Sequence, residues 1–334
     1  MTRLVVRPAA KVSFTLHKRG VVTGAGLLVA LVLAVVASLG IGSTFVEPGD
    51  VLRALFDVPT WADRLVESRV PRIVLAMVVG AALGLAGALL QGVSRNPLAS
   101  PDVIGVSQGA GLAASIVIVS GAPIAVLPPL ALLGGLGAAA VVLLFGSVRG
   151  NRFVLAGIAV AVALRALTEI VIVGAAPIDG QRAQIWIVGT LAGWGYDEAL
   201  VIAVVIAVLT PVLFWAGRAL DTSALSDDVA VAIGVRVGPR RLVMALSGVV
   251  LAAFATSQVG AVDFVALAAP QIARRLARAE RPPLFCAALT GALLTVAADT
   301  AARTLFAPNQ LPVGVMTAAF GGVYLIWLLV RRKR

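Results

Sequence analysis

Ionisable side chains are rare within the long apolar runs of this sequence, and two pairs of them stand four residues apart. Arg165 and Glu169 form one pair, and Asp299 and Arg303 repeat the spacing in a later run. Residues four apart share one face of an α-helix, so each pair can neutralise its own charge. In a membrane such residues face the bundle interior or a water-filled cavity. Two interpretations stay open for Arg165 and Glu169: a structural ion pair and a pair that lines a translocation path.

The residue types that carry catalysis and cofactor binding are largely missing. No Gly-x4-Gly-Lys-Ser/Thr phosphate loop occurs, so the chain is not expected to bind ATP in that manner. The single histidine, His17, precedes the first apolar run, and the single cysteine, Cys286, excludes a thiolate metal cluster and an intramolecular disulfide. No serine stands with a plausible base inside an apolar run, which argues against an intramembrane protease. We predict no catalytic residue, no metal site and no cofactor bound by this chain.

The composition indicates a membrane protein. Hydrophobic residues make up 60% of the 334 residues and charged residues only 13%, whereas about 45–50% apolar residues are usual in a soluble domain. A chain with so little polar surface needs lipid as its solvent. The net charge of +11 could suggest nucleic acid. However, the basic residues stand in short tracts between apolar runs, without interleaved aromatic residues, and this pattern is typical of membrane orientation signals.

Ten apolar segments predict membrane-spanning helices, each of which needs about 20 residues. They lie near residues 21–41, 71–92, 102–120, 124–146, 153–174, 199–217, 240–258, 263–278, 284–304 and 311–330. The third and eighth are the weakest, because one is rich in glycine and the other contains Pro270. We predict an all-α polytopic fold: a cytoplasmic N-terminal segment at 1–20 and a single transmembrane domain at 21–334. The first run is long enough to span, so no cleavable signal peptide is expected.

Basic residues favour one side of the predicted bundle. They are concentrated at both ends of the chain and in the even-numbered connections between spans. Of the 27 arginines and lysines, the opposite side holds only Arg53, Arg64, Arg69, Arg72, Arg182 and Arg303. Positively charged connections remain on the inner side of the membrane, so both termini are predicted to be cytoplasmic.

One cytoplasmic connection, at about 218–239, is longer than a turn requires. Ser226 or Asp227 can cap a short helix that runs through about Ile233, and Gly234 can end it. Such a helix suits docking into a partner protein, although an ordinary connecting helix has the same signals.

Five segments resemble, in the same order, the family of ABC importer permeases for iron–siderophore complexes and vitamin B12. They are RVPRIVLAMVVGAALGLAGALLQGVSRNPLASPDVIGVSQGAGLAA (69–114), ALSDDVAVAIGV (224–235), AVDFVALAAPQIARRL (261–276), AADTAAR (297–303) and LPVGVMTAAFGGVYLIWLL (311–329). The resemblance runs from about residue 45 to the end. Many members carry Pro-His where this chain has Pro270-Gln271, and the glutamine form resembles the second permease of ferric-enterobactin-type systems. That form implies a heterodimer and a catecholate or mixed siderophore.

The resemblance implies a transport subunit rather than an enzyme, in the bacterial cytoplasmic membrane. Two permease chains would enclose a path, two ATPase subunits would use ATP and Mg on the cytoplasmic side, and an extracytoplasmic binding protein would deliver a ferric siderophore. The iron would arrive already coordinated, so the permease would need no metal ligands. A permease for vitamin B12 or haem is the alternative within the class. A secondary carrier or channel is the alternative from another class, against which the coupling loop and the few membrane carboxylates speak.

The resemblance also implies roles for particular residues. ATPase coupling is expected from Asp227, Asp228, Ala230, Ala232, Gly234 and Val235. A cytoplasmic gate is expected from Asn96, Pro97, Leu98, Gly150 and Asn151, although a helix-ending Asn-Pro turn explains the first two equally well. Docking of the binding protein is expected from Arg69, Arg72 and Arg303. The alternatives are that the first two anchor a helix at the lipid headgroups and that Arg303 only pairs with Asp299. Arg165 departs from the family pattern, so its role is not inherited.

Overall fold

The computed structural model describes residues 3–9, 12–42, 44–56, 58, 60–145, 151–222, 227–232 and 234–332. Gly150, predicted as a gate residue, lies outside the described residues, as do Ser226 and Ile233 of the predicted coupling loop. Asn151, Asp227 and Asp228 are described by their backbone only.

Seven helices in the described ranges are long and apolar enough to cross a membrane. They are α1 (Lys18–Gly40), α3 (Asp63–Ser94), α5 (Leu127–Phe145), α6 (Asn151–Val173), α8 (Tyr196–Thr222), α10 (Val237–Val259) and α12 (Leu284–Thr304). They correspond to the first, second, fourth, fifth, sixth, seventh and ninth predicted spans, so those spans are confirmed as long apolar helices. A 3-10 helix, η2 (Ile124–Val126), leads directly into α5.

The remaining three predicted spans differ in length. The last one forms α13 (Val313–Arg332), whereas α4 (Val106–Val119) and α11 (Val265–Leu276) have only 14 and 12 residues. At 1.5 Å per residue, α11 is about 18 Å long, well short of the hydrocarbon core of about 30 Å. Irregular backbone precedes both short helices: the 3-10 helix η1 (Asp102–Ile104) before α4 and residues 260–264 before α11. Such backbone is tolerated at membrane depth only where protein surrounds it.

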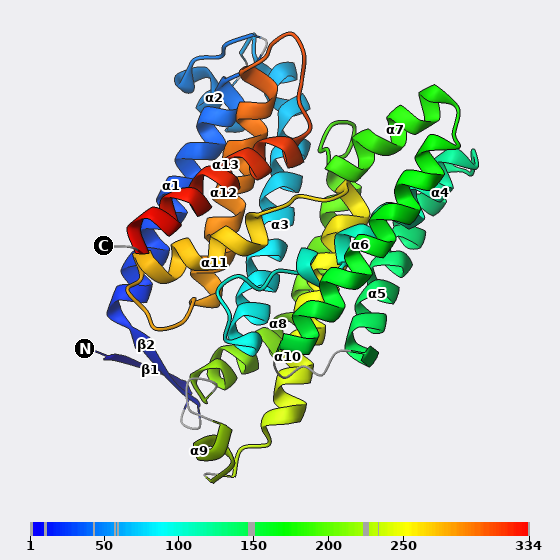
Figure 1. Cartoon of the computed structure of the whole chain (residues 1–334). Coiled ribbons are helices and arrows are strands. Elements are labelled where there is room, and N and C mark those ends of the chain that lie inside the picture. The colour runs from blue at the N-terminus through cyan, green and yellow to red at the C-terminus, as the bar shows by residue number, and fades with distance from the viewer. Residues whose placement is uncertain are drawn as a thin grey trace.

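Four shorter elements complete the fold. Helices α2 (Pro48–Leu55) and α7 (Pro177–Val188) lie at one end of the bundle (Figure 1). Helix α9 (Asp227–Ala232) and an antiparallel hairpin of β1 (Arg3–Ala9) and β2 (Val12–His17) lie at the other end. The hairpin adds two strands, before the first long helix, to the predicted all-α fold, in which residues 1–20 were assigned only to a cytoplasmic segment.

Helix α3 stands at the centre of the packing and lies against α12 and α10 (Figure 1). Its glycines permit this, because a Cβ added to Gly80 would lie closer than 3.0 Å to the backbone of Gly291, and one added to Gly84 would meet Ala287 in the same way. The spacing of Gly80 and Gly84 is the small-xxx-small pattern that lets helices approach closely in membranes. These two glycines therefore serve the close packing of α3 against α12.

Candidate functional site

At the outer end of the bundle, one buried carboxylate joins two of the predicted docking arginines. Asp299 on α12 has a side chain that is only 1% exposed. Arg72 on α3 donates from Nε to its Oδ1 at 2.9 Å, and the Nη2 of Arg72 lies 2.8 Å from the same oxygen. Arg303 donates from Nε to Oδ2 at 3.0 Å. The pairing of Asp299 with Arg303 is the one that the four-residue spacing predicted, and its sharing with Arg72 comes from tertiary packing.

The two arginines carry this cluster to neighbouring segments. Arg303 Nη2 donates to the Ser38 Oγ on α1 at 2.7 Å, and Arg72 Nη1 donates to Gln310 Oε1 at 3.0 Å. Ser38 also accepts a hydrogen bond from Thr300 at 2.8 Å. The cluster therefore fastens α1, α3 and α12 together beside the segment that leads into α13.

Arg69, the third predicted docking arginine, points into the protein. Its guanidinium donates to the backbone carbonyls of Leu39, Gly40 and Thr44, which lie at and just beyond the end of α1. The last carbonyls of a helix lack partners within the helix, so a cation that donates to them stabilises that end. Arg69 is 9% exposed, whereas the side chain of Arg72 is 16% exposed. Neither a headgroup anchor nor a direct docking contact is favoured by the geometry of Arg69.

Three of the predicted gate residues, Asn96, Pro97 and Leu98, form a tight turn after α3. The Asn96 Oδ1 accepts a hydrogen bond from the backbone N–H of Leu98 at 3.0 Å, and Leu98 is exposed. This is the turn that Asn-Pro sequences favour, so the helix-ending interpretation describes its geometry. A gating role for the turn stays a prediction.

Two glutamines tie this turn to α11. Gln271 donates from Nε2 to the Oε1 of Gln91 at 2.5 Å and to the carbonyl of Pro97 at 3.3 Å. Gln91 in turn donates to the carbonyl of Leu267 at 3.0 Å, and Arg274 donates to Gln271 at 2.9 Å. Gln271, which the sequence marked only as a departure from the family pattern, thus connects α3, the turn and α11.

The predicted coupling helix is present as α9, and its C-terminal cap has the expected form. Gly234 has a φ of 80°, in the left-handed region that glycine adopts without steric cost. The N–H of Val235 donates to the carbonyl of Ala230 at 2.9 Å, and the N–H of Gly234 donates to Val231 at 2.9 Å. These two bonds make a Schellman motif, which is the helix stop that Gly234 predicted.

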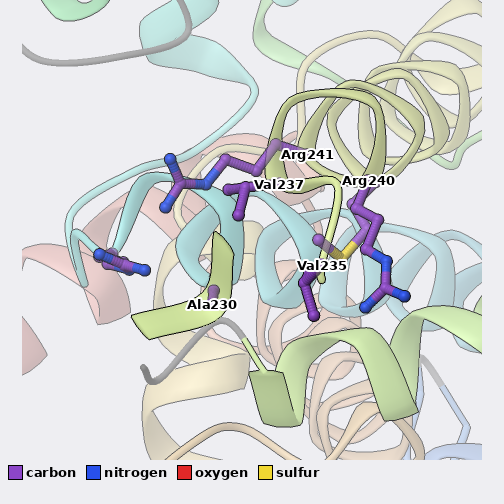
Figure 2. Close-up of a pocket in the computed structure, with 7 residues that line it drawn as sticks. Ala230, Val235, Val237, Arg240 and Arg241 are labelled. Atoms are coloured by element: carbon purple, nitrogen blue, oxygen red, sulfur yellow. The ribbon is translucent and has the colours of Figure 1, made fainter. Parts of the chain in front are cut away.

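One predicted coupling residue faces its own chain. Ala230 is 2% exposed and lies in a small pocket formed with the end of α3 and the start of α10 (Figure 2). The pocket is lined by Arg95, Ala230, Val235, Val237, Arg240, Arg241 and Met244. Among the α9 residues whose side chains the structure describes, Val229, Val231 and Ala232 are exposed. Ala230 therefore cannot form an outer contact, which corrects that prediction, and the two valines are contact candidates that sequence reasoning missed.

The pair on α6 is not buried in the bundle. Arg165 and Glu169 are both exposed, whereas the buried and close-packed side of α6 carries Gly157 and Thr168. Within the part of the chain that the structure describes, Arg165 and Glu169 form no ion pair with each other, although they are one turn apart. The internal structural pair that the spacing allowed is therefore wrong for the single chain.

Two carboxylates that sequence reasoning left aside lie at the irregular segments before the short helices. Asp102 begins η1 and accepts a hydrogen bond from the Ser107 Oγ at 2.5 Å. Asp263 lies in the segment that precedes α11. No group of three or more histidine, cysteine, aspartate and glutamate side chains that could hold a metal ion occurs among the described residues.

Long apolar helices around two half-length helices define a multi-pass membrane protein. Residues 30–331 match the model of the FecCD transport family, and the chain belongs to that family. It is the permease subunit of an ABC transporter in the bacterial cytoplasmic membrane and is not itself catalytic.

Two relatives and one solved structure illustrate the similarity. The chain is 37% identical over 324 residues to the ferric enterobactin transport system permease protein FepG of Escherichia coli (strain K12), covering 95% of this chain and 98% of FepG. It is 36% identical over 310 residues to the Fe(3+)-citrate import system permease protein YfmE of Bacillus subtilis (strain 168), covering 91% and 93%. A solved inward-facing structure, described as a metal-chelate type ABC transporter, superposes with a TM-score of 0.81 at 28% identity and covers 92% and 98% of the two chains.

Proposed function

We propose that the chain imports ferric siderophores, with a catecholate or mixed chelate as the substrate. The observation that carries this proposal is the match to FepG over 95% of the chain, because FepG is named for ferric enterobactin transport. Vitamin B12 or haem is the alternative cargo. Capture of the cognate binding protein, followed by mass spectrometry of its bound ligand, tests the proposal: a ferric siderophore supports it, and a corrinoid or haem contradicts it.

The proposed assembly contains a second, different permease chain, two ATPase subunits that use ATP and Mg, and an extracytoplasmic binding protein. The chain would form one transmembrane domain at 21–334, with about ten membrane segments, a cytoplasmic segment at 1–20 and a coupling loop at about 218–239. The position of α9 and the N-terminal hairpin at one end of the bundle, opposite α2 and α7, supports a cytoplasmic N-terminus (Figure 1).

A secondary carrier or channel would behave differently in uptake assays. An ATP-driven importer loses uptake when vanadate blocks the ATPase and retains it when a protonophore is added at constant ATP. The opposite pattern would support the carrier.

Arg165 and Glu169 support the assembly of two permease chains. A charged side chain at the bilayer centre costs about 2.5–3.5 kcal/mol on insertion scales, and both side chains are exposed on the single chain. We place this face of α6 against the second chain or the path between the chains, where lipid does not reach it.

Arg72 and Arg303 remain the proposed docking residues, with Arg69 supporting them from inside. The planar guanidinium of an arginine meets a carboxylate with two parallel hydrogen bonds. Arg72 is the most exposed of the three, and its outer nitrogen is held only by the neutral Gln310.

Replacing Arg72 with glutamine is expected to weaken binding-protein affinity about tenfold or more, since close interfacial charge pairs couple by about 1.5 kcal/mol at least. The loss should shrink at high salt, because salt screens exposed charges. Affinity is measured on the complete importer in nanodiscs at low and high salt. Arg64→Gln is the matched control, because Arg64 is exposed on the same end of α3 outside the cluster. Equal affinities for the Arg72 and Arg64 variants would contradict docking.

Cysteines at Asn96 and Asn151 are expected to change their reactivity toward a cytoplasmic thiol reagent when ATP is added, because the proposed gate opens and closes between transport states. The background is Cys286→Ala, which removes the single native cysteine. A cysteine at Gly238, exposed at the start of α10, serves as the control. Labelling rates that stay constant at both gate positions would count against gating.

A further inference from the structure

The buried carboxylate of Asp299 determines how the two docking arginines present their charge. Its two oxygens accept from the Nε atoms of Arg72 and Arg303 at 2.9 and 3.0 Å. The inner edge of each guanidinium is thus occupied by Asp299. One terminal nitrogen of each arginine has another partner: the Nη1 of Arg72 donates to Gln310, and the Nη2 of Arg303 donates to Ser38.

We propose that Asp299 is a positioning residue for binding-protein docking: it holds Arg72 and Arg303 side by side, so that the Nη1 of Arg72 faces the exposed Gln310. This inference rests on the proposed docking role of those arginines. Arg72 and Arg303 would repel each other without an anion between them, because two like charges at this depth are poorly screened. Asp299 makes their close approach favourable and leaves the pair with a net positive charge.

The neutral partner at the outer edge completes the argument. Gln310 is exposed and accepts from Arg72 Nη1 through an uncharged amide oxygen. A carboxylate on the binding protein forms a stronger, charge-assisted bond, so it replaces Gln310 without displacing Asp299. The inner carboxylate and the incoming one then hold opposite edges of the same guanidinium.

The same contacts extend from the docking surface into the bundle. Asp299 lies on α12, Arg72 on α3, and Ser38, the second acceptor of Arg303, on α1. Two of these helices, α3 and α12, are the ones that Gly80 and Gly84 bring into close contact. A displacement of the two arginines therefore acts on α1, α3 and α12 together.

A simpler role for Asp299 predicts the opposite sign. If Asp299 only masked positive charge, its neutralisation would raise the charge of the docking surface and strengthen the attraction of an acidic partner, most of all at low salt. If it positions the arginines, neutralisation frees both guanidinium groups to separate, and affinity falls despite the added charge.

The test uses the complete importer in nanodiscs and its binding protein, with Asp299→Asn, Asp299→Glu and the control Glu67→Gln. Glu67 is exposed on the outer end of α3, so its neutralisation adds the same charge outside the cluster. We expect Asp299→Asn to weaken binding about tenfold at low salt, Asp299→Glu to restore part of the affinity, and Glu67→Gln to leave it unchanged or slightly stronger. An affinity for Asp299→Asn equal to or above that of the native chain overturns the proposal.

A double-variant cycle separates positioning from general damage. If Asp299 acts through Arg72, the loss caused by Asp299→Asn largely disappears in an Arg72→Gln background, whereas independent effects add. Additive losses overturn the proposal even if Asp299→Asn alone weakens binding. If Arg72→Gln by itself changes nothing, the docking role has failed instead. If Asp299→Asn does not yield folded importer, Ser38→Ala, which removes the hydroxyl that accepts from Arg303 and Thr300, takes its place. It is expected to weaken binding about threefold, and native affinity would overturn the proposal.

Discussion

A permease with valine in place of Gly234 is expected to insert normally but to lose most ATP-driven uptake and most of the ATPase activity that the loaded binding protein stimulates. Gly234 has a φ of 80° and closes the Schellman motif that ends α9. Replacing a glycine in the left-handed region with an ordinary residue costs about 1–2 kcal/mol, and a β-branched side chain fits worst. No atom lies within 4 Å of a Cβ built at Gly234, so the effect comes from the backbone alone.

The expected loss of uptake and ATPase activity follows from the position of α9 in the fold. Ala230 sits in the pocket between Arg95, at the end of α3, and Met244 on α10, and Arg95 directly precedes the gate turn. A change in the orientation of α9 therefore alters its contact with the end of α3, which leads into Asn96. The exposed residues Val231 and Ala232 are left for the proposed ATPase contact.

Gly238→Val is the matched control for this result. Gly238 also has no atom within 4 Å of a built Cβ and has no positive φ, so valine there meets neither a steric nor a conformational barrier. Ala232→Trp provides a second arm, because it adds bulk on the exposed face of α9 without touching the cap. Uptake and stimulated ATPase activity are measured in proteoliposomes at matched permease content. Native coupling in both the Gly234 and Ala232 variants would remove α9 from the transport mechanism.

The long spans and the stop at Gly234 were predictable because their signals are local. An apolar run of about 20 residues has one favourable environment, and glycine after a short helical segment has a specific backbone role. The shortness of α11 was not predictable. Gly260 and Phe264 have positive φ values and bound an irregular segment, which is stable at membrane depth only where other parts of the protein surround it. Hydropathy counts such a segment as a span.

In the proposed docking cluster of Arg72, Asp299 and Arg303, too, one contact was predictable from local signals and another was not. The pairing of Asp299 with Arg303 follows from helical spacing within α12, so the sequence predicted it. The hydrogen bond from Arg72 to Asp299 joins residues far apart in the chain. Helical periodicity in the sequence cannot predict such a contact. Arg69 looked equivalent to Arg72 because the two arginines are three residues apart, yet it donates to carbonyls at the end of α1. Which arginine remains available depends on where α1 ends, and that is a property of packing.

Valine in place of Gly84 is expected to prevent formation of a stably folded permease. A Cβ at this position would lie closer than 3.0 Å to the backbone of Ala287 on α12, and backbone atoms cannot rotate away as a side chain does. Overpacking a well-packed core costs about 1–3 kcal/mol, occasionally more, and here two helices must separate. Close approach of small residues is also a main source of helix association in lipid, so we expect a loss of about 3 kcal/mol.

Gly137 provides the matched control for this prediction. Gly137 lies in the apolar helix α5 and has no atom within 4 Å of a built Cβ, so Gly137→Val changes hydropathy and helix propensity equally without a clash. We expect Gly137→Val to show native elution and a melting temperature within a few degrees of the native chain. Gly84→Val should yield little monodisperse protein in detergent, with a strongly lowered melting temperature where any is recovered. Similar melting temperatures for the two variants would mean that α3 and α12 do not require the close contact at Gly84.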